Sequence, residues 1–194
     1  MPANTVTISP ATQLEESGWI ERARANPADF RPLYERYFRT IFLFVLHRVG
    51  EKDTAADLTQ QVFTNALVHL KRYEARGVPF SAWLYRIALN QCHDFFRRQQ
   101  RVRHVVLEEA DLHKLHGGIT AADSLQNWVA ALPEVLARLS EKELELIELR
   151  FFEQRPFKEI AAILGISEVY AKVRTYRILD RMKAVFTDIQ QKQA

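Results

Sequence analysis

Basic residues gather at two places in this sequence, and clustered arginine and lysine side chains are typical of surfaces that bind nucleic-acid phosphates. The first cluster, residues 97–103, holds four arginines and no acidic residue. The second cluster, residues 167–186, holds five basic residues and two acidic ones. Because the net charge of the whole chain is only +3, the clustering and not the total charge indicates a nucleic-acid partner.

The second cluster lies in a pattern typical of a helix-turn-helix. A short helix is expected to end at Gly165, which can adopt the left-handed conformation of a tight turn. Ala161 is small enough for two helices to cross closely, and Ser167 can cap the second helix. The second helix carries a stripe that we expect to pack inward: Ala171, Thr175, Ile178, Met182 and Val185. Its basic residues lie off this stripe, which predicts a helix that binds the major groove of DNA, although a helical hairpin with a solvated basic face has the same pattern.

The first cluster follows several aromatic residues, Tyr73, Phe80, Trp83 and Tyr85. Arginine binds phosphates and aromatic rings stack on unpaired bases, so the combination suits single-stranded or melted nucleic acid. Two simpler explanations compete with this one. Aromatic residues at helical spacing also form cores, and the helix dipole favours arginine at the C-terminus of a helix.

The elements that carry these clusters are predicted to be helices. Apolar residues recur at three- and four-residue steps from about residue 19 to 101 and from about 125 to 186, without the two-residue alternation of strands. We therefore expect an all-α fold, with two small helical domains joined by a flexible linker and the helix-turn-helix in the C-terminal domain. The expected parts are a flexible N-terminal tail at 1–18, a helical domain at 19–102, a linker at 103–125, the helix-turn-helix domain at 126–187 and a C-terminal tail at 188–194.

Single residues predict several helix ends. Gly50 is expected to cap the C-terminus of one helix, and Ser81 the N-terminus of another. Ser140 and Glu143 have the spacing of a capping box. Pro133 is expected to interrupt or restart the helix that begins near residue 125.

The composition argues against an enzyme. The six glycines are not clustered as a phosphate-binding loop or a dinucleotide fingerprint requires. His113 and His116 have the spacing of a weak metal pair but stand in the predicted linker without a third ligand, and no acid–base constellation is evident. We therefore expect no catalytic residue, no bound metal and no cofactor. The single cysteine and the lack of an apolar run of roughly 20 residues favour a soluble cytoplasmic protein without membrane insertion.

Three stretches follow one another along the chain. They are Ala56-Asp-Leu-Thr-Gln-Gln-Val-Phe63; Phe80-Ser-Ala-Trp-Leu-Tyr-Arg-Ile-Ala-Leu-Asn90 with Arg97-Arg98; and Leu139 to Arg150 with Phe157-Lys-Glu-Ile-Ala to Arg177. In this order, over residues 30–102 and 126–186, the sequence resembles bacterial RNA polymerase sigma factors of the sigma-70 family, extracytoplasmic-function (ECF) subgroup. The stretches resemble, in turn, that family's polymerase-binding helix, promoter-melting helix and promoter-reading domain.

The resemblance implies a sigma factor that binds core RNA polymerase, directs it to specific promoters and promotes melting of the −10 element. The implied core polymerase-binding residues, facing the clamp helices, are Asp57, Leu58, Gln60 and Gln61. The implied −10 DNA-binding residues are Tyr73, Phe80, Trp83, Arg86, Asn90, Arg97, Arg98 and Arg101, with the loop 73–80 and Asn90 holding an extruded base. The implied −35 DNA-binding residues are Ser167, Glu168, Tyr170, Lys172, Val173, Arg174 and Arg177. The implied partners are core RNA polymerase, promoter DNA both as duplex and melted, and an anti-sigma factor.

The sequence departs from the family pattern at three places. Gln61 stands where an acidic residue is usual, and Leu67 replaces a common tryptophan. Val169-Tyr170-Ala171 replaces the usual Gly-Thr-Val at the start of the recognition helix, so −35 specificity does not carry over from relatives. The alternative function is a helix-turn-helix transcriptional regulator that does not bind polymerase as a sigma subunit.

Overall fold

The computed structural model of the chain describes residues 10–75, 77–99, 115 and 125–193, which fall into two compact units, one before residue 107 and one from that residue onward. All regular elements within these ranges are helical, as the all-α prediction requires. The first unit contains α1 (Pro10–Ala25), η1 (Pro27–Phe30), α2 (Arg31–Val49), α3 (Lys52–His69), η2 (Leu70–Arg72) and α4 (Phe80–Gln99). The second contains α6 (Leu125–Ala137), α7 (Glu141–Ile147), η3 (Glu148–Phe152), α8 (Phe157–Leu164) and α9 (Glu168–Gln193). Most of the predicted linker, including His113 and His116, lies outside the described residues, and so does Arg101, which precedes the linker.

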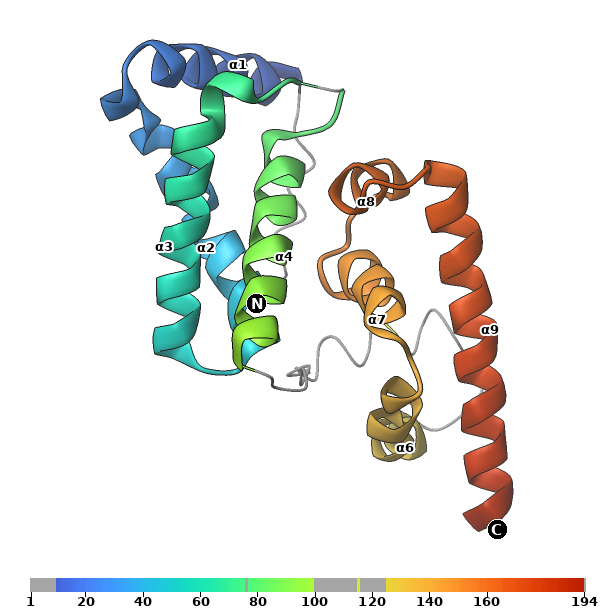
Figure 1. The fold of residues 1–194 in the computed structure, drawn as a ribbon. Coiled ribbons are helices and arrows are strands. Elements are labelled where there is room, and N and C mark those ends of the chain that lie inside the picture. The colour runs from blue at the N-terminus through green and yellow to red at the C-terminus, as the bar shows by residue number, and fades with distance from the viewer. Residues whose placement is uncertain (1–9, 76, 100–114, 116–124, 194) are drawn as a thin grey trace. The chain divides into compact units, whose positions relative to one another are not determined.

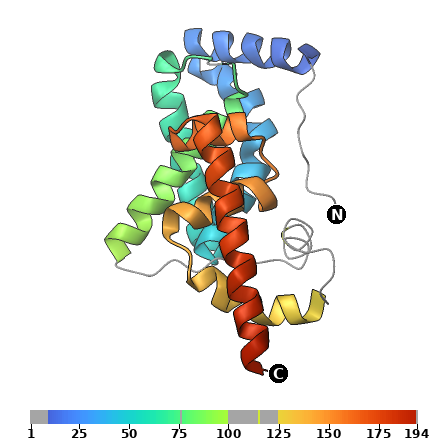
Figure 2. The same cartoon turned by 90° about the vertical axis from the view of Figure 1, so that its right-hand side faces the viewer.

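The first unit is built around α2, α3 and α4, which pack side by side (Figure 1). Each helix buries an apolar stripe with the three- and four-residue spacing seen in the sequence. The buried stripe of α2 includes Leu33, Tyr37, Ile41, Phe44 and Val45, and that of α3 includes Leu58, Val62 and Ala66. α1 lies across one end of these helices, against α2 and η2 (Figures 1 and 2). The unit therefore has its own core, with α1 covering one end of it.

The helix ends around α2 and α3 follow from local chemistry. Gly50 has a φ of 74° and donates its N–H to the carbonyl of Leu46 at 2.8 Å, which confirms the predicted C-cap. α3 begins after Glu51, whose carboxylate accepts hydrogen bonds from the N–H groups of Asp53 at 2.8 Å and Thr54 at 2.6 Å.

The prediction of a flexible tail over residues 1–18 is wrong for residues 10–18, which form the first part of α1. Residues 1–9 lie outside the described range. Hydrophobic periodicity does not predict this helix because its buried apolar residues from position 14 onward are only Ile20 and Ala23. Its remaining buried side chain is that of Glu16, a charged residue that an apolar pattern does not register.

α4 begins with a different cap from the predicted one. The helix starts at Phe80, and Ser81 is a buried residue of its first turn, so Ser81 is not the capping residue. The N–H of Phe80 instead donates to Oε1 of Glu16 on α1 at 3.0 Å. The cap is supplied by a carboxylate 64 positions away in the chain.

In the second unit, α6, α7 and α8 all pack against the long helix α9 (Figure 2). The predicted inward stripe of α9 is confirmed at four positions, and at the fifth Val185 is half-buried. The four are Ala171, Thr175, Ile178 and Met182, each at most 1% exposed. Basic residues of α9 consequently lie on its other faces.

Two helix boundaries in this unit differ from the prediction. Pro133 does not interrupt α6, which runs unbroken from Leu125 to Ala137, since a proline removes one helical hydrogen bond without always ending the helix. α9 continues to Gln193, so the C-terminal tail predicted at 188–194 is wrong up to that residue. The apolar stripe extends as far as Ile189, which is 6% exposed, and neither glycine nor proline occurs after Gly165.

The segment after α7 takes an unexpected form. The predicted capping box is present, because Oε2 of Glu143 accepts a hydrogen bond from the N–H of Ser140 at 2.9 Å. The helix then widens into the π-helical turn η3, where the N–H of Glu153 donates to the carbonyl of Glu148 at 2.9 Å.

Two further features bear on the sequence analysis. Cys92 on α4 is fully buried. None of the described helices is long and apolar enough to cross a membrane.

Candidate nucleic-acid and polymerase interfaces

The outer face of α3 carries the polar residues that the sequence assigns to polymerase binding. Asp57, Gln60 and Gln61 are exposed. Together with Thr64 and Asn65 they line an open, shallow hollow of about 380 Å³. These positions recur at three- and four-residue steps, so one face of one helix presents a carboxylate, three amides and a hydroxyl. Such a face suits a partner surface that offers hydrogen-bond donors and positive charge.

Leu58 does not belong to this face. It is 6% exposed and shares the buried stripe of α3 with Ala55 and Val62. Asp57 is exposed, whereas the side chain of Leu58, rotated by about 100° around the helix axis, is turned into the core. Leu58 supports the exposed face from beneath it and is a core residue, contrary to its assignment from the resemblance.

α4 presents a line of residues predicted to contact melted DNA. Trp83, Arg86, Asn90 and Arg97 are separated by three, four and seven positions, which places them along one side of a helix. Trp83 and Arg86 are half-buried, whereas Asn90, Arg97 and Arg98 are exposed. Arg97 forms an ion pair with Asp94 at 2.7 Å, and its side chain remains 77% exposed. The arrangement leaves the guanidinium accessible to a phosphate, because an exposed pair of this kind is weak.

Tyr73 and Phe80 occupy a different environment from the residues of that line. Tyr73 is 7% exposed and Phe80 is fully buried. Their rings lie 5.1 Å apart between centroids, and Trp83 lies 5.0 Å from Tyr73 and 5.4 Å from Phe80. These rings form an aromatic cluster where the segment between α3 and α4 meets α4. The side chain of Phe80 offers no surface to DNA here and holds the end of that segment in place.

α8 and α9 form the helix-turn-helix expected from the sequence. Gly165 has a φ of 69° and ends α8 in the left-handed conformation. Oγ of Ser167 accepts a hydrogen bond from the N–H of Tyr170 at 3.1 Å, which confirms the predicted N-cap of α9. Ile163 and Ala171, one from each helix, are buried in the crossing.

The exposed face of α9 combines cations with large apolar side chains. Lys172 and Arg177 are exposed, and no ion pair to either is found among the described residues. Four large apolar residues are also exposed on this helix: Val169 (73%), Tyr170 (55%), Val173 (44%) and Tyr176 (52%). Val169 and Tyr176 were not assigned from the sequence, although the inward stripe at 171, 175 and 178 already implies that 169, 173 and 176 face outward.

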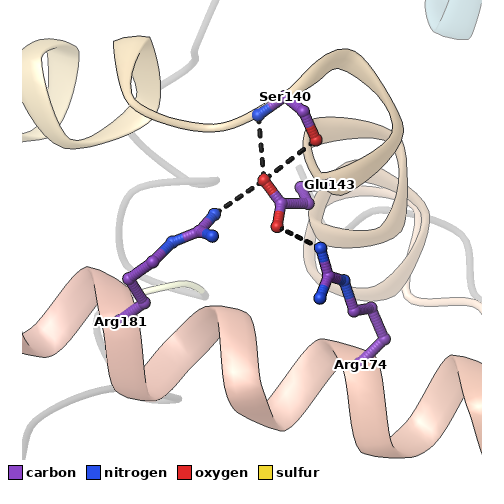
Figure 3. A network of polar contacts seen from close by, with 4 residues as sticks. All are labelled: Ser140, Glu143, Arg174 and Arg181. Carbon is purple, nitrogen blue, oxygen red and sulfur yellow. Dashed lines mark hydrogen bonds and ion pairs between the residues drawn. The ribbon is translucent and has the colours of Figure 1, made fainter.

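Arg174, which is predicted to contact the −35 element, also forms an ion pair within the second unit. Its NH2 lies 2.7 Å from Oε1 of Glu143, while the NH2 of Arg181 lies 2.6 Å from Oε2 of the same carboxylate (Figure 3). Oε2 also accepts a hydrogen bond from Oγ of Ser140 at 2.9 Å. Glu143 thus links the start of α7 to two turns of α9. Arg174 is held by this network, with its side chain 40% exposed.

The charge of Glu143 is strongly favoured at this position. The hydrogen bond from Arg181 is the largest cause, with those from Ser140 adding to it, and together they lower the pKa of Glu143 to about 2 against the cost of burial. The carboxylate therefore stays ionised at neutral pH. Among the cations of α9 whose side chains the structure describes, Lys172, Arg177 and Lys183 are exposed without an ion pair, and the first two lie near the start of the helix.

Comparison with protein-family models places both units in one family. Residues 33–102 match the model described as Sigma-70 region 2, and residues 135–184 match Sigma-70, region 4. The first match covers α2, α3 and α4, and the second covers the helix-turn-helix. α1 precedes both matches.

Two curated proteins illustrate the relationship at the sequence level. The ECF RNA polymerase sigma factor BldN of Streptomyces coelicolor is 32% identical over 87% of this chain and 65% of its own length, so the chain spans slightly less than two thirds of that relative. The ECF RNA polymerase sigma factor SigD of Mycobacterium bovis is 32% identical over 79% of this chain and 71% of its own.

A solved structure supports the fold. The sigma factor RpoE of Bartonella quintana, in complex with the anti-sigma factor NepR, aligns with 82% of this chain and 97% of its own at a TM-score of 0.56 and 20% identity. The family matches to regions 2 and 4 and the identity to SigD together decide the classification. This chain belongs to the ECF group of RNA polymerase sigma factors.

Proposed function

We propose that this chain binds core RNA polymerase through the outer face of α3, holds the melted −10 element along α4 and binds the −35 element as duplex with α9. The single observation that carries the proposal is the joint match to sigma regions 2 and 4, with an exposed polar face on the first and exposed cations on the second. A protein with these partners would act in the bacterial cytoplasm. It would act by binding alone, without chemistry of its own.

The division of labour follows from the exposed groups. Lys172 and Arg177 supply phosphate contacts on α9, while Tyr170 and Val173 face outward beside them and would contact base edges, including thymine methyl groups. On α4, Asn90 and the arginines lie on one side of the helix, as contacts to one separated strand require. Flipping a base costs a few kcal/mol, and stacking returns roughly 1–3 kcal/mol per base, so the first unit would reduce the cost of melting.

The alternative, a helix-turn-helix regulator that does not bind polymerase, is not favoured. It explains the second unit but gives no reason for a region 2 match over residues 33–102. It also gives no reason for the polar face of α3.

Transcription with core polymerase tests the proposal directly. Fragmented genomic DNA is transcribed by bacterial core RNA polymerase with and without the full chain, and the 5′ ends of the transcripts are sequenced. We expect a set of new start sites preceded by shared −10 and −35 motifs. If no new start site appears on any of the tested DNA, the proposal is overturned.

The polymerase-binding face is tested with a pair of matched carboxylate variants. Asp57→Ala removes the only charge of the hollow on α3, and we expect roughly tenfold weaker binding to core polymerase, measured by titration, with unchanged thermal stability. Asp29→Ala removes an exposed carboxylate from η1 of the same unit and serves as the control. Equal affinities for the two variants would exclude this face as the contact.

We also propose an anti-sigma partner for this chain, by analogy with the complex of RpoE and NepR. The exposed apolar residues of α9 are the surface that such a partner would cover.

A further inference from the structure

α1 is hydrogen-bonded to both ends of the segment that joins α3 to α4, residues 70–79, called here the α3–α4 connection. At its start, the guanidinium of Arg24 donates to the carbonyl of Leu70, 3.3 Å from Nε, and to the carbonyl of Tyr73. At its end, the carboxylate of Glu16 accepts the N–H of Phe80 at 3.0 Å. Two side chains of one helix therefore fix where the α3–α4 connection begins and where it ends.

Glu16 is itself held in place. It is 5% exposed, and its second oxygen accepts a hydrogen bond from the hydroxyl of Tyr37 on α2. Burial, and then the nearby negative charge of Glu16, raise the pKa of Tyr37 well above its ordinary value, so the phenol stays protonated and keeps donating. The carboxylate is thus fixed by α2 on one side and directs its other oxygen at the first turn of α4.

The anchored ends carry the aromatic cluster. Tyr73 and Phe80 belong to the two anchoring points, and their rings pack on each other and on Trp83. A displacement of either backbone anchor would move these rings. It would also move the start of α4 and with it the line of residues that runs to Asn90.

We propose that α1 is a positioning element for −10 recognition, in which Glu16 and Arg24 set the geometry of the α3–α4 connection that receives the extruded base. The inference rests on the proposed function of this connection and of α4. α1 ends before residue 33, where the region 2 match begins, so the family match does not assign it a role. Selection among bases depends on placement to within a fraction of an ångström. The described part of the connection has only the short helix η2 as regular structure, so its placement depends on how its ends are anchored.

The experiment measures base selectivity at −10 and at −35 in one reaction. A promoter used by the wild-type chain is prepared as a pool with randomised −10 and −35 positions, transcribed with core polymerase, and the transcribed templates are sequenced. For Glu16→Ala we expect selectivity at the −10 element to fall about fivefold or more, the range that loss of one well-placed base contact gives. Selectivity at −35 is expected to stay at the wild-type level, since α9 lies in the other unit.

Three variants make the result specific. Glu16→Gln keeps an acceptor oxygen of the same size and is expected to recover most of the selectivity. Glu15→Ala removes the exposed carboxylate beside it on α1 and should match the wild type. Arg24→Ala removes the anchor at the other end of the α3–α4 connection, is expected to lower −10 selectivity as well, and carries the test if Glu16→Ala does not fold.

The outcomes separate positioning from mere stability. If Glu16→Ala and Arg24→Ala lower transcription equally from all templates, in proportion to the folded fraction measured by circular dichroism, α1 is only structural and the inference is overturned. Unchanged −10 selectivity in both variants also overturns it. If the wild-type chain supports no transcription from any template, the proposed function fails, and that failure is visible before any variant is compared.

Discussion

At the scale of single residues, Glu143 shows how one buried carboxylate serves two purposes. It completes the capping box of α7 and binds two arginines of α9 that are seven positions apart. Nothing in the local pattern predicts the second purpose, because Arg174 and Arg181 lie 31 and 38 positions later in the chain. The sequence therefore predicts the cap correctly and misses the partner that holds Arg174.

Glu143→Gln tests how much this network contributes to the free energy of unfolding. The substitution keeps the side-chain size but removes the charge that both arginines contact, and we expect the free energy of unfolding to fall by about 2–3 kcal/mol. The measurement is urea denaturation followed by circular dichroism. Glu134→Gln is the control, since Glu134 pairs with Arg138 at 2.6 Å but both side chains are about half exposed, and its loss should cost under about 0.5 kcal/mol. Equal losses of unfolding free energy in the two variants would show that burying the ion pair adds nothing to stability.

The same carboxylate predicts a pH dependence. The pKa of Glu143 is lowered to about 2 in the folded chain from an ordinary value of 4.5, so its contribution is complete above about pH 5. That contribution is lost as the pH falls toward 2, because the unfolded chain binds the proton first, and it amounts to about 3 kcal/mol. We expect the stability of the wild type to fall more steeply than that of Glu143→Gln between pH 5 and pH 2. If the unfolding free energies of the two proteins, measured by chemical denaturation, fall in parallel with pH, the low pKa assigned to Glu143 is wrong.

At the scale of elements, α9 packs against its unit with one face and carries exposed cations on its other faces. The buried stripe at 171, 175, 178 and 182 leaves Lys172 and Arg177 exposed near the start of the helix. This division is predicted by the sequence alone, because a period of 3.6 residues assigns each position to a face. The sequence does not predict which of the exposed cations stay available to DNA, since that depends on ion-pair partners far away in the chain.

Lys172→Ala tests whether the first turns of α9 bind DNA. Loss of one phosphate contact should weaken promoter binding by the polymerase complex to a similar degree for all sequences. It should also reduce the slope of log affinity against log salt by about 1. Lys183→Ala is the matched control, because Lys183 is exposed on the same helix about 16 Å further along. If the control changes the salt slope and Lys172→Ala does not, a different part of α9 docks.

α1 shows where prediction from sequence ends. The helices α2, α3, α4 and α9 follow from strong apolar periods, and Gly50 and Gly165 end their helices as their conformational freedom predicts. α1 is anchored to the two ends of the α3–α4 connection by Glu16 and Arg24, whose partners there lie between 46 and 64 positions away. Polar anchors of this kind leave no periodic signal. The same reason explains why Ser81 is the wrong capping residue, since a local serine cannot reveal a distant carboxylate.

At the scale of the whole molecule, each unit has its own buried core and its own polar network. Glu16 belongs to the first unit and Glu143 to the second. Because stability is a property of cooperative units, the two should respond separately to damage.

Calorimetry tests this independence. We expect two thermal transitions for the full chain, with Glu143→Gln lowering the midpoint of one and Glu16→Ala lowering the midpoint of the other. Buried charged contacts of this size should shift a midpoint by several degrees in units this small. A single transition that both variants lower would mean that the units unfold as one.

The burial of Cys92 makes the chain suited to site-specific labelling. It is the only cysteine in the sequence, and its side chain is fully enclosed in the first unit, so thiol-reactive dyes would leave it untouched in the folded chain. Cysteines introduced at two exposed positions, Val68 on α3 and Lys183 on α9, would carry a donor and an acceptor fluorophore. Energy transfer between the dyes would then follow the spacing of the units as promoter DNA and polymerase are added, one molecule at a time.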